Sequence, residues 1–253
     1  MNYDQLLNIS VELGCQLMFS GAEIYRVEES VRRLLQAYGL ESPEVFAIPN
    51  CVIVSVTTPA GHPITRMRRI ASHGTDIQLL ERCNELCRQL CAQTPPIEEA
   101  QSMISALSDR TRQYALWQVL LGYGIAPAFF APLFGGKAED ILAAMLGGLA
   151  VGFCLLYAGR LIGSNSFFRT VICSAVASLL SLLLVRLGLG RSVDTVTISV
   201  LMVLVPGVAL TNAMREIMAG DIISGLSRAA DSILTGTAIA IGTALGLSIG
   251  WIF

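Results

Sequence analysis

The stretch DTVTISVLMVLVPGVALTNAMREIMAGDIISGLSRAAD, residues 194–231, joins a long apolar run to a polar segment, and Pro206-Gly207 interrupts the apolar run. Proline lacks a backbone N–H and clashes with the preceding turn, so we expect the helix to break there. A broken helix is tolerated at membrane depth only where it packs against protein or lines a wet cavity. Secondary transporters build substrate sites near the bilayer midplane from such helices. The stretch therefore favours transport over simple anchoring, with a purely structural kink as the alternative.

The residues at and beyond this break are the candidates for binding a substrate, namely Pro206, Gly207, Asn212, Arg215 and Arg228. Either arginine can hold a substrate carboxylate, because a planar guanidinium matches the geometry of that group. The acidic residues of the same stretch are candidates for carrying a coupling proton, if burial raises the pKa, and they are Glu216, Asp221 and Asp231. A cluster of ion pairs that only orients a loop at the membrane surface is the alternative.

Charged residues are few and unevenly distributed. Of the 253 residues, 53% are hydrophobic and 14% are charged, whereas soluble domains carry about 25% charged residues. Residues 1–112 hold ten arginines and thirteen acidic residues, while residues 113–253 hold only seven basic and six acidic ones. This distribution predicts a polar N-terminal domain at 1–112 and a membrane domain at 113–253. No basic stripe suited to nucleic acid is present.

Five apolar runs follow the polar part, each near the ~20 residues that cross a bilayer, at about 115–134, 140–161, 168–187, 193–214 and 230–252. The N-terminal sequence does not resemble a signal peptide, so we expect a cytoplasmic N-terminus. Arginines are more frequent in the loops on that side, as the positive-inside rule requires. We therefore predict a multi-pass α-helical membrane protein with about five transmembrane helices and a periplasmic C-terminus.

The N-terminal domain has the pattern of an α+β fold. Apolar residues recur with helical spacing through residues 3–39, which we interpret as two helices separated at Ser20-Gly21. Residues 44–70 contain β-branched runs and predict two or three short strands with a hairpin near Ala60-Gly61. Helical spacing returns at 76–92. The cluster of charged residues that begins at Glu23 is interpreted as a solvated helix face.

Cysteines and catalytic motifs argue against a metal centre or an enzyme. Cys83, Cys87 and Cys91 recur every four residues on one helix face. That spacing does not match the paired cysteines of zinc sites, so we interpret them as buried reduced thiols. The sequence contains no Walker A, GxSxG or HExxH pattern. We therefore predict no enzymatic activity, no metal and no cofactor.

Two runs of small residues have the spacing that lets membrane helices approach closely. The last span carries Gly242, Gly246 and Gly250, and the second span carries Gly148 and Gly152. Packing within the chain and docking of a partner subunit are both open at this point.

Several segments resemble the threonine/serine exporter family, ThrE. They are SGAEIYRVEESVRRLLQAYGL at 20–40, PITRMRRI at 63–70 and VPGVALTNAMREIMAGDIISGLSRAADSIL at 205–234. The resemblance covers nearly the whole chain. It points to the same break and polar stretch as functional, although Glu216 stands where the family often has an aspartate.

The chain has about five spans, whereas full-length members of that family have about twice as many. The resemblance thus implies a split type, the large subunit of a two-component exporter in the bacterial inner membrane. It implies a small membrane partner subunit resembling YjjB, a hetero-oligomer, and a small carboxylate such as succinate as substrate. Threonine or serine is the alternative substrate. Two alternatives belong to other classes of function. One is a passive channel subunit, and the other is a membrane-tethered sensor or enzyme whose working part is the N-terminal domain.

Overall fold

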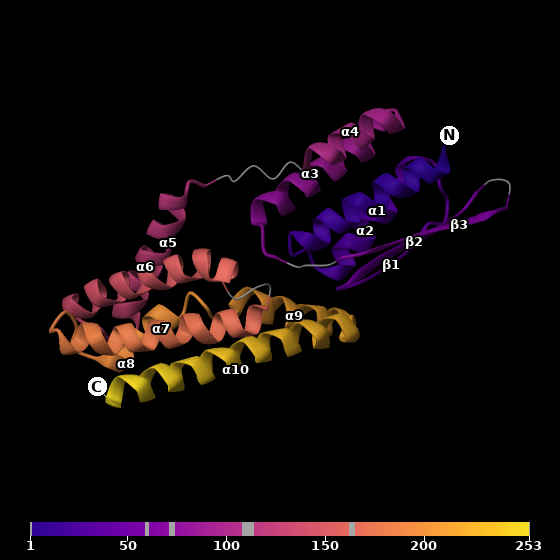
Figure 1. Ribbon diagram of the computed structural model, residues 1–253. Helices are drawn as coiled ribbons and strands as arrows, with labels where there is room; N and C mark the ends of the chain where they lie inside the picture. Colours follow the sequence, from indigo (N-terminus) through magenta and orange to yellow (C-terminus); the bar gives the residue numbers. More distant parts are fainter. Residues whose placement is uncertain (1, 59–60, 71–73, 108–113, 162–164, 253) are drawn as a thin grey trace. The chain divides into compact units, whose positions relative to one another are not determined.

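The computed structural model describes residues 2–58, 61–70, 74–107, 114–161 and 165–252 and divides into two compact units (Figure 1). The first unit contains Met1–Thr111 together with Leu210–Ala229. The second contains Arg112–Ala209 and Ala230–Phe253. The segment 210–229 thus packs with the N-terminal part of the chain, although it lies within the stretch that the sequence assigns to the membrane domain.

The first unit has three layers (Figure 1). An antiparallel sheet of order β1-β2-β3 forms the first layer, α1 and α2 pack on it, and α3 and α4 pack on α1 and α2. The elements are α1 (Tyr3–Phe19), α2 (Ile24–Ala37), β1 (Glu44–Ile48), β2 (Cys51–Thr57), β3 (Pro63–Arg69), α3 (Ile77–Gln93) and α4 (Ile97–Leu107). The predicted α+β pattern is therefore present as a small three-stranded sheet covered by helices. Of the predicted hairpin turn, Ala60 lies outside the described residues.

Helix α1 contacts both the sheet and the outer helices because apolar residues cover most of its circumference. Leu6, Leu13 and Leu17 are fully buried, and even Ser10 is buried, with its hydroxyl donating to the carbonyl of Leu6 at 2.8 Å. Gly14 lets the neighbouring layers approach closely. A narrow polar stripe of α1 remains accessible, in which Asp4 pairs with Arg66 and Glu12 with Arg68 of β3, while the wider apolar face is buried.

The turn between α1 and α2 positions the start of α2. Gly21 has φ +92°, a left-handed conformation that a residue with a side chain rarely adopts. A Cβ atom at Gly21 would also lie 2.8 Å from the carbonyl oxygen of Gly74. The amide of Asp76 donates to the carbonyl of Ser20 at 3.0 Å, and the side chain of Asp76 caps α3. The turn is thus fixed from both sides, which places Ala22, Glu23 and Ile24 in one defined position.

The second unit consists of helices. It contains α5 (Leu116–Leu133), α6 (Ala138–Leu161), α7 (Ser166–Arg186), α8 (Val193–Leu201), the start of α9 (Gly207–Ala219) and most of α10 (Ile222–Ile252). Among the described residues, four helices are long and apolar enough to cross a membrane: Leu116–Leu133, Ala138–Tyr157, Ser166–Arg186 and Ile222–Ile252. Large side chains such as Phe129, at 76% exposure, and Leu133, at 72%, are mostly uncovered. Exposed apolar surface of this kind suits contact with lipid.

Two predictions about the spans need correction. The span predicted at 193–214 is not one helix, since α8 ends at Leu201 and α9 begins at Gly207. The physical reason is Pro206, which cannot donate to the turn before it. The last helix begins at Ile222 rather than near 230, so the polar link expected at 215–229 is helical except around Gly220. Five unbroken transmembrane helices are therefore not confirmed.

The glycine runs pack inside the second unit. A Cβ atom at Gly242 would collide with Ser174 and Val171 of α7, and one at Gly246 would collide with Ser178 and Ala175. Gly250 faces Leu182 of α7 in the same way. This close approach brings α10 alongside α7 (Figure 1).

The second glycine run packs against α5. A Cβ atom at Gly152 would lie 2.6 Å from the Cβ of Tyr123, and one at Gly148 would lie 2.6 Å from Pro127. Both glycine runs are therefore occupied by helix packing within the chain.

Candidate functional site

The segment 210–229 forms a helical hairpin, made by the end of α9 and the start of α10, and we call it the α9–α10 hairpin. Gly220 has φ +100° at its turn, and the amide of Asp221 donates to the carbonyl of Glu216 at 2.9 Å. A Cβ atom at Gly225 would lie 2.8 Å from the carbonyl oxygen of Ala213, so the two helices are in close contact. The hairpin brings Arg215, Glu216 and Arg228 to the α1–α2 turn.

Glu216 is the centre of the site. Its side chain is fully buried, at 0% exposure. One carboxylate oxygen, Oε1, lies 3.3 Å from Nε of Arg228 and accepts a hydrogen bond from the amide of Ile24 at 3.3 Å. The other oxygen, Oε2, is buried and has no hydrogen-bond partner in the described part of the chain. A buried carboxylate with one oxygen left unsatisfied is costly.

Arg228 links the hairpin to the α1–α2 turn. Its side chain is only 17% exposed, and Nη2 donates to the carbonyl of Ala22 at 2.9 Å while Nε faces Glu216. The guanidinium therefore holds one backbone acceptor of the turn and one carboxylate of α9. Removing either charge would leave the other buried with reduced compensation.

The interpretation of the charged cluster at the start of α2 as a solvated face is wrong for Glu23. It is 5% exposed, and its carboxylate pairs with Arg215 of the hairpin and, at 2.7 Å, with Nε of Arg26. The carboxylate at the start of α2 thus binds Arg215 of the α9–α10 hairpin, which lies 192 residues further along the chain. Arg26 and Arg215 both remain more than half exposed, so water reaches this side of the cluster.

The pKa values of the two carboxylates of the cluster shift in opposite directions. Burial raises the pKa of Glu216 above its ordinary value; Arg228 and the amide of Ile24 oppose that shift, and the charges of Asp221 and Glu23 add to it. Burial also acts to raise the pKa of Glu23, but hydrogen bonds from Arg215 and Tyr25 and the charge of Arg26 outweigh it and lower that pKa. Of the two, Glu216 is the one suited to take up a proton.

The remaining candidates are dispersed. Asp221 is half-buried and lines a cavity of about 360 Å³ between β1 and the hairpin turn. Asn212 is half-buried in α9. Pro206 and Gly207 belong to the second unit, as does Asp231, which is exposed. The structure therefore brings together Arg215, Glu216 and Arg228 within the first unit, and it adds Glu23 and the backbone of Ala22 and Ile24, which the sequence analysis did not include.

Metal chemistry finds no support in the described residues. No group of three His, Cys, Asp or Glu side chains within them is arranged to hold a metal ion. The seven cysteines are free thiols. Burial raises the pKa of Cys83 to about 12, which makes it a structural rather than a reactive thiol.

Comparison with known proteins gives a consistent family. The ThrE family model, described as "Putative threonine/serine exporter", matches residues 8–250. The chain is 24% identical to a "Probable threonine/serine exporter" of Mycobacterium tuberculosis and 22% identical to a "Threonine/serine exporter" of Corynebacterium glutamicum. Each alignment covers 96% of this chain but only 46% and 51% of those proteins, so the chain spans about half their length.

A third relative matches this chain over nearly the whole length of both proteins. The "Probable succinate transporter subunit YjjP" of Klebsiella aerogenes is 24% identical, with 96% of this chain and 95% of that protein aligned. No solved structure matches the chain. The names of the relatives indicate a transporter rather than an enzyme, and the four apolar helices indicate a membrane protein. Because the family model matches almost the whole sequence, the chain belongs to the threonine/serine exporter family.

Proposed function

We propose that this chain is one subunit of a two-component secondary exporter, which moves small carboxylates out of the cytoplasm in exchange for protons. The observation that carries the proposal is Glu216, a buried carboxylate with a raised pKa beside Arg228. We favour succinate or another C4-dicarboxylate as substrate. We place the protein in the bacterial inner membrane, with the N-terminal unit in the cytoplasm.

The ion pairs supply a physical mechanism for exchange. Arg215 is held by Glu23, and Arg228 is held by Glu216. A substrate with two carboxylates can replace both acidic partners, because guanidinium groups bind carboxylates of any origin. A proton that arrives on Oε2 of Glu216 removes the negative charge next to Arg228 and weakens that ion pair. Uptake of that proton thereby assists the return of the substrate-free protein, and its release restores the pair of Glu216 with Arg228.

Export of threonine or serine is the second candidate. An amino acid needs one cationic and one anionic partner, and the cluster contains arginines paired with carboxylates. Two relatives carry the name of a threonine/serine exporter, whereas another carries the name of a succinate transporter subunit. The two substrates therefore have to be compared in one assay.

The partner is proposed to be a small membrane subunit of the YjjB type. One observation supports a second component: a relative that the chain matches over 95% of its length is named a subunit. Because Gly148, Gly152, Gly242, Gly246 and Gly250 are occupied by contacts within the chain, the partner has to dock on other faces.

The test is transport by inside-out vesicles that contain the chain and its partner, with labelled succinate or threonine outside and an acidic lumen. We expect proton-driven accumulation of succinate that is lost in Arg215→Ala. Arg66→Ala is the matched control, since Arg66 of β3 forms an exposed ion pair with Asp4 of α1. Flux that ignores the proton gradient would instead indicate a passive channel. No flux of either compound, or full flux in Arg215→Ala, would overturn the proposal and favour a sensor or enzyme role for the N-terminal unit.

A further inference from the structure

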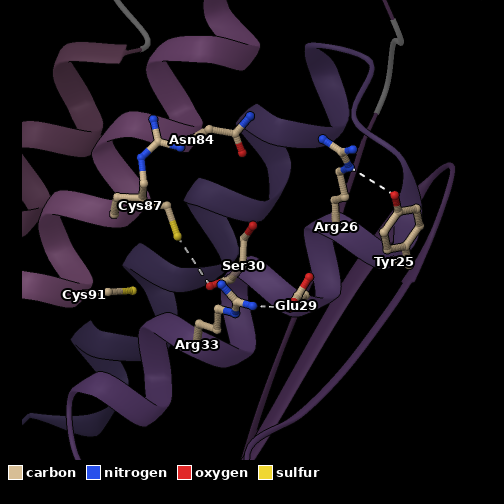
Figure 2. A pocket seen from close by; sticks show the side chains of 9 residues that line it. Tyr25, Arg26, Glu29, Ser30, Arg33, Asn84, Cys87 and Cys91 are labelled. Carbon is tan, nitrogen blue, oxygen red and sulfur yellow. Dashed lines mark hydrogen bonds and ion pairs between the residues drawn. The ribbon is translucent and has the colours of Figure 1, made fainter.

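A groove between α2 and α3 adjoins the ion-pair cluster at Arg26 but has no role in the proposed transport step. It has a volume of about 610 Å³, within the range typical of small-molecule sites. One face of each helix lines it, with Tyr25, Arg26, Glu29, Ser30 and Arg33 from α2 and Asn84, Cys87, Arg88 and Cys91 from α3. Figure 2 shows the labelled side chains of the two helices around the same space.

The charges around this groove are mostly positive. Three guanidinium groups line it against one carboxylate, that of Glu29. Arg33 pairs with Glu29 at 2.5 Å, and Arg88 pairs with Glu85, outside the lining, at 2.5 Å. All four of these side chains are about half exposed or more, and exposed pairs of this kind contribute at most about 1 kcal/mol. An incoming anion can therefore replace these partners at little cost.

The floor of the groove is uncharged and offers further hydrogen-bonding groups. Cys87 is buried, and its thiol donates to the carbonyl of Ser30 at 3.6 Å. Asn84 contributes an amide and Tyr25 a hydroxyl group to the lining. A pocket with a compact neutral floor and arginines at its rim suits a small organic molecule with anionic groups rather than an extended polymer.

We propose that this groove binds a small organic dianion, either a dicarboxylate or a phosphate monoester, through Arg33 and Arg88 with a contribution from Arg26. Both ligand types present two negative charges to two guanidinium forks. The binding site stands independently of the transport mechanism.

Arg26 connects this groove to the ion-pair cluster. It lines the groove, and its Nε also lies 2.7 Å from the carboxylate of Glu23, which holds Arg215. A dianion that draws Arg26 into the groove weakens the hold on Glu23 and so changes the availability of Arg215. This regulatory consequence rests on the proposed function, whereas binding in the groove does not.

The test measures alkylation of Cys91 by N-ethylmaleimide in the purified full chain, with the modified residue identified by mass spectrometry. Cys91 is half-buried in the lining, so a ligand in the groove should protect it. The probes are succinate, glycerol 3-phosphate and inorganic phosphate, with acetate at equal ionic strength as the monoanion control. We expect protection by succinate or glycerol 3-phosphate and not by acetate, and the stronger of the two identifies the ligand type. Protection by inorganic phosphate with none by either organic dianion would overturn the proposal of an organic ligand.

Two sets of variants decide where the ligand binds. Arg33→Gln with Arg88→Gln should weaken protection at least about tenfold, the loss of one charge-assisted hydrogen bond or more. Arg66→Gln with Arg69→Gln removes the same charge from β3 and should leave protection unchanged. Protection should also persist in Arg215→Ala, which separates this site from the transport site. No protection by any dianion, or equal protection after loss of Arg33 and Arg88, would overturn the proposal.

Discussion

Replacing Arg228 by methionine tests the energetic core of the site. Methionine keeps an unbranched apolar side chain but removes the charge that faces Glu216. Nε of Arg228 lies 3.3 Å from Oε1 of Glu216, which corresponds to an attraction of about 5 kcal/mol at an effective dielectric constant near 20. Desolvation of the two charges offsets much of this attraction in the intact pair, but a buried charge left alone costs roughly 3–5 kcal/mol. Arg228 is 17% exposed and Glu216 can take up a proton, so we expect the lower end, about 3 kcal/mol.

The proton gives this destabilisation a defined pH dependence. The pKa of Glu216 is already raised from its ordinary value of 4.5 by burial, and loss of Arg228 raises it further. A group whose pKa is higher in the folded state contributes stability at low pH, and this contribution is lost as the pH rises through the folded pKa. The difference between Arg228→Met and the wild type should therefore grow once the pH passes the folded pKa of Glu216 in the wild type, which lies above 4.5, by at most about 1.4 kcal/mol per pH unit.

The assay is thermal unfolding of the full chain in detergent, followed by circular dichroism from pH 5 to pH 8. For a chain of this length, about 3 kcal/mol corresponds to a fall in Tm of roughly 6–12 °C at neutral pH. Adding Glu216→Gln to Arg228→Met should restore most of this loss, because the unpaired buried charge is then gone. Arg66→Met, at an exposed pair with Asp4, should change Tm by no more than about 4 °C. An unchanged Tm in Arg228→Met, or no rescue by Glu216→Gln, would refute the reasoning.

Three further predictions concern packing, loop anchoring and thiol reactivity. Gly246→Ala should destabilise the second unit by about 1–3 kcal/mol, because the new methyl group meets Ser178 and Ala175; Gly236→Ala, where no atom lies within 4 Å, is the control in the same unfolding assay. Asp140→Ala should cost about 3 kcal/mol or more, because the carboxylate accepts from the amides of Lys137, Arg191 and Ser192 at 3.0, 2.6 and 3.0 Å; a loss no larger than that of Glu139→Ala would contradict this account. Cys83, with a pKa of about 12, should resist N-ethylmaleimide at pH 8 in the folded chain and react in denaturant. Rapid labelling of Cys83 in the native protein would show that this thiol is not buried.

Helices and helix ends were predicted correctly where the residues that determine them lie close together in the sequence. The apolar spacing of Val27, Val31 and Leu34 identifies α2, whose buried face consists of these residues and their helical neighbours. The steric rule for Pro206 predicts the end of the helix before it, and the structure has that break. Residues 193–214 were nevertheless predicted as one span, because hydropathy alone is not sensitive to a proline that divides an apolar run. The start of α10 was placed too late, because Ser224, Ser227 and Arg228 lower hydropathy without preventing a helix.

The site itself could be predicted only in part. Arg215, Glu216 and Arg228 stand out because ionisable residues follow directly after an apolar run. Glu23 does not, because an acidic residue at a helix start is ordinary in solution, and its partner lies 192 residues away. The contribution of the Ile24 amide and the Ala22 carbonyl is backbone chemistry, which no side-chain pattern records. Three-dimensional contact was therefore needed to distinguish a solvated face from a buried ion-pair cluster.

The central claim is that Glu216 carries the proton that drives export, and Glu216→Gln tests it most directly. Glutamine keeps the size of the side chain and an acceptor for the amide of Ile24, but it cannot exchange a proton at neutral pH. In inside-out vesicles with the partner subunit, we predict that this variant exchanges labelled for unlabelled succinate across the membrane but no longer accumulates succinate in response to an acidic lumen. Undiminished proton-driven accumulation by Glu216→Gln would contradict the account.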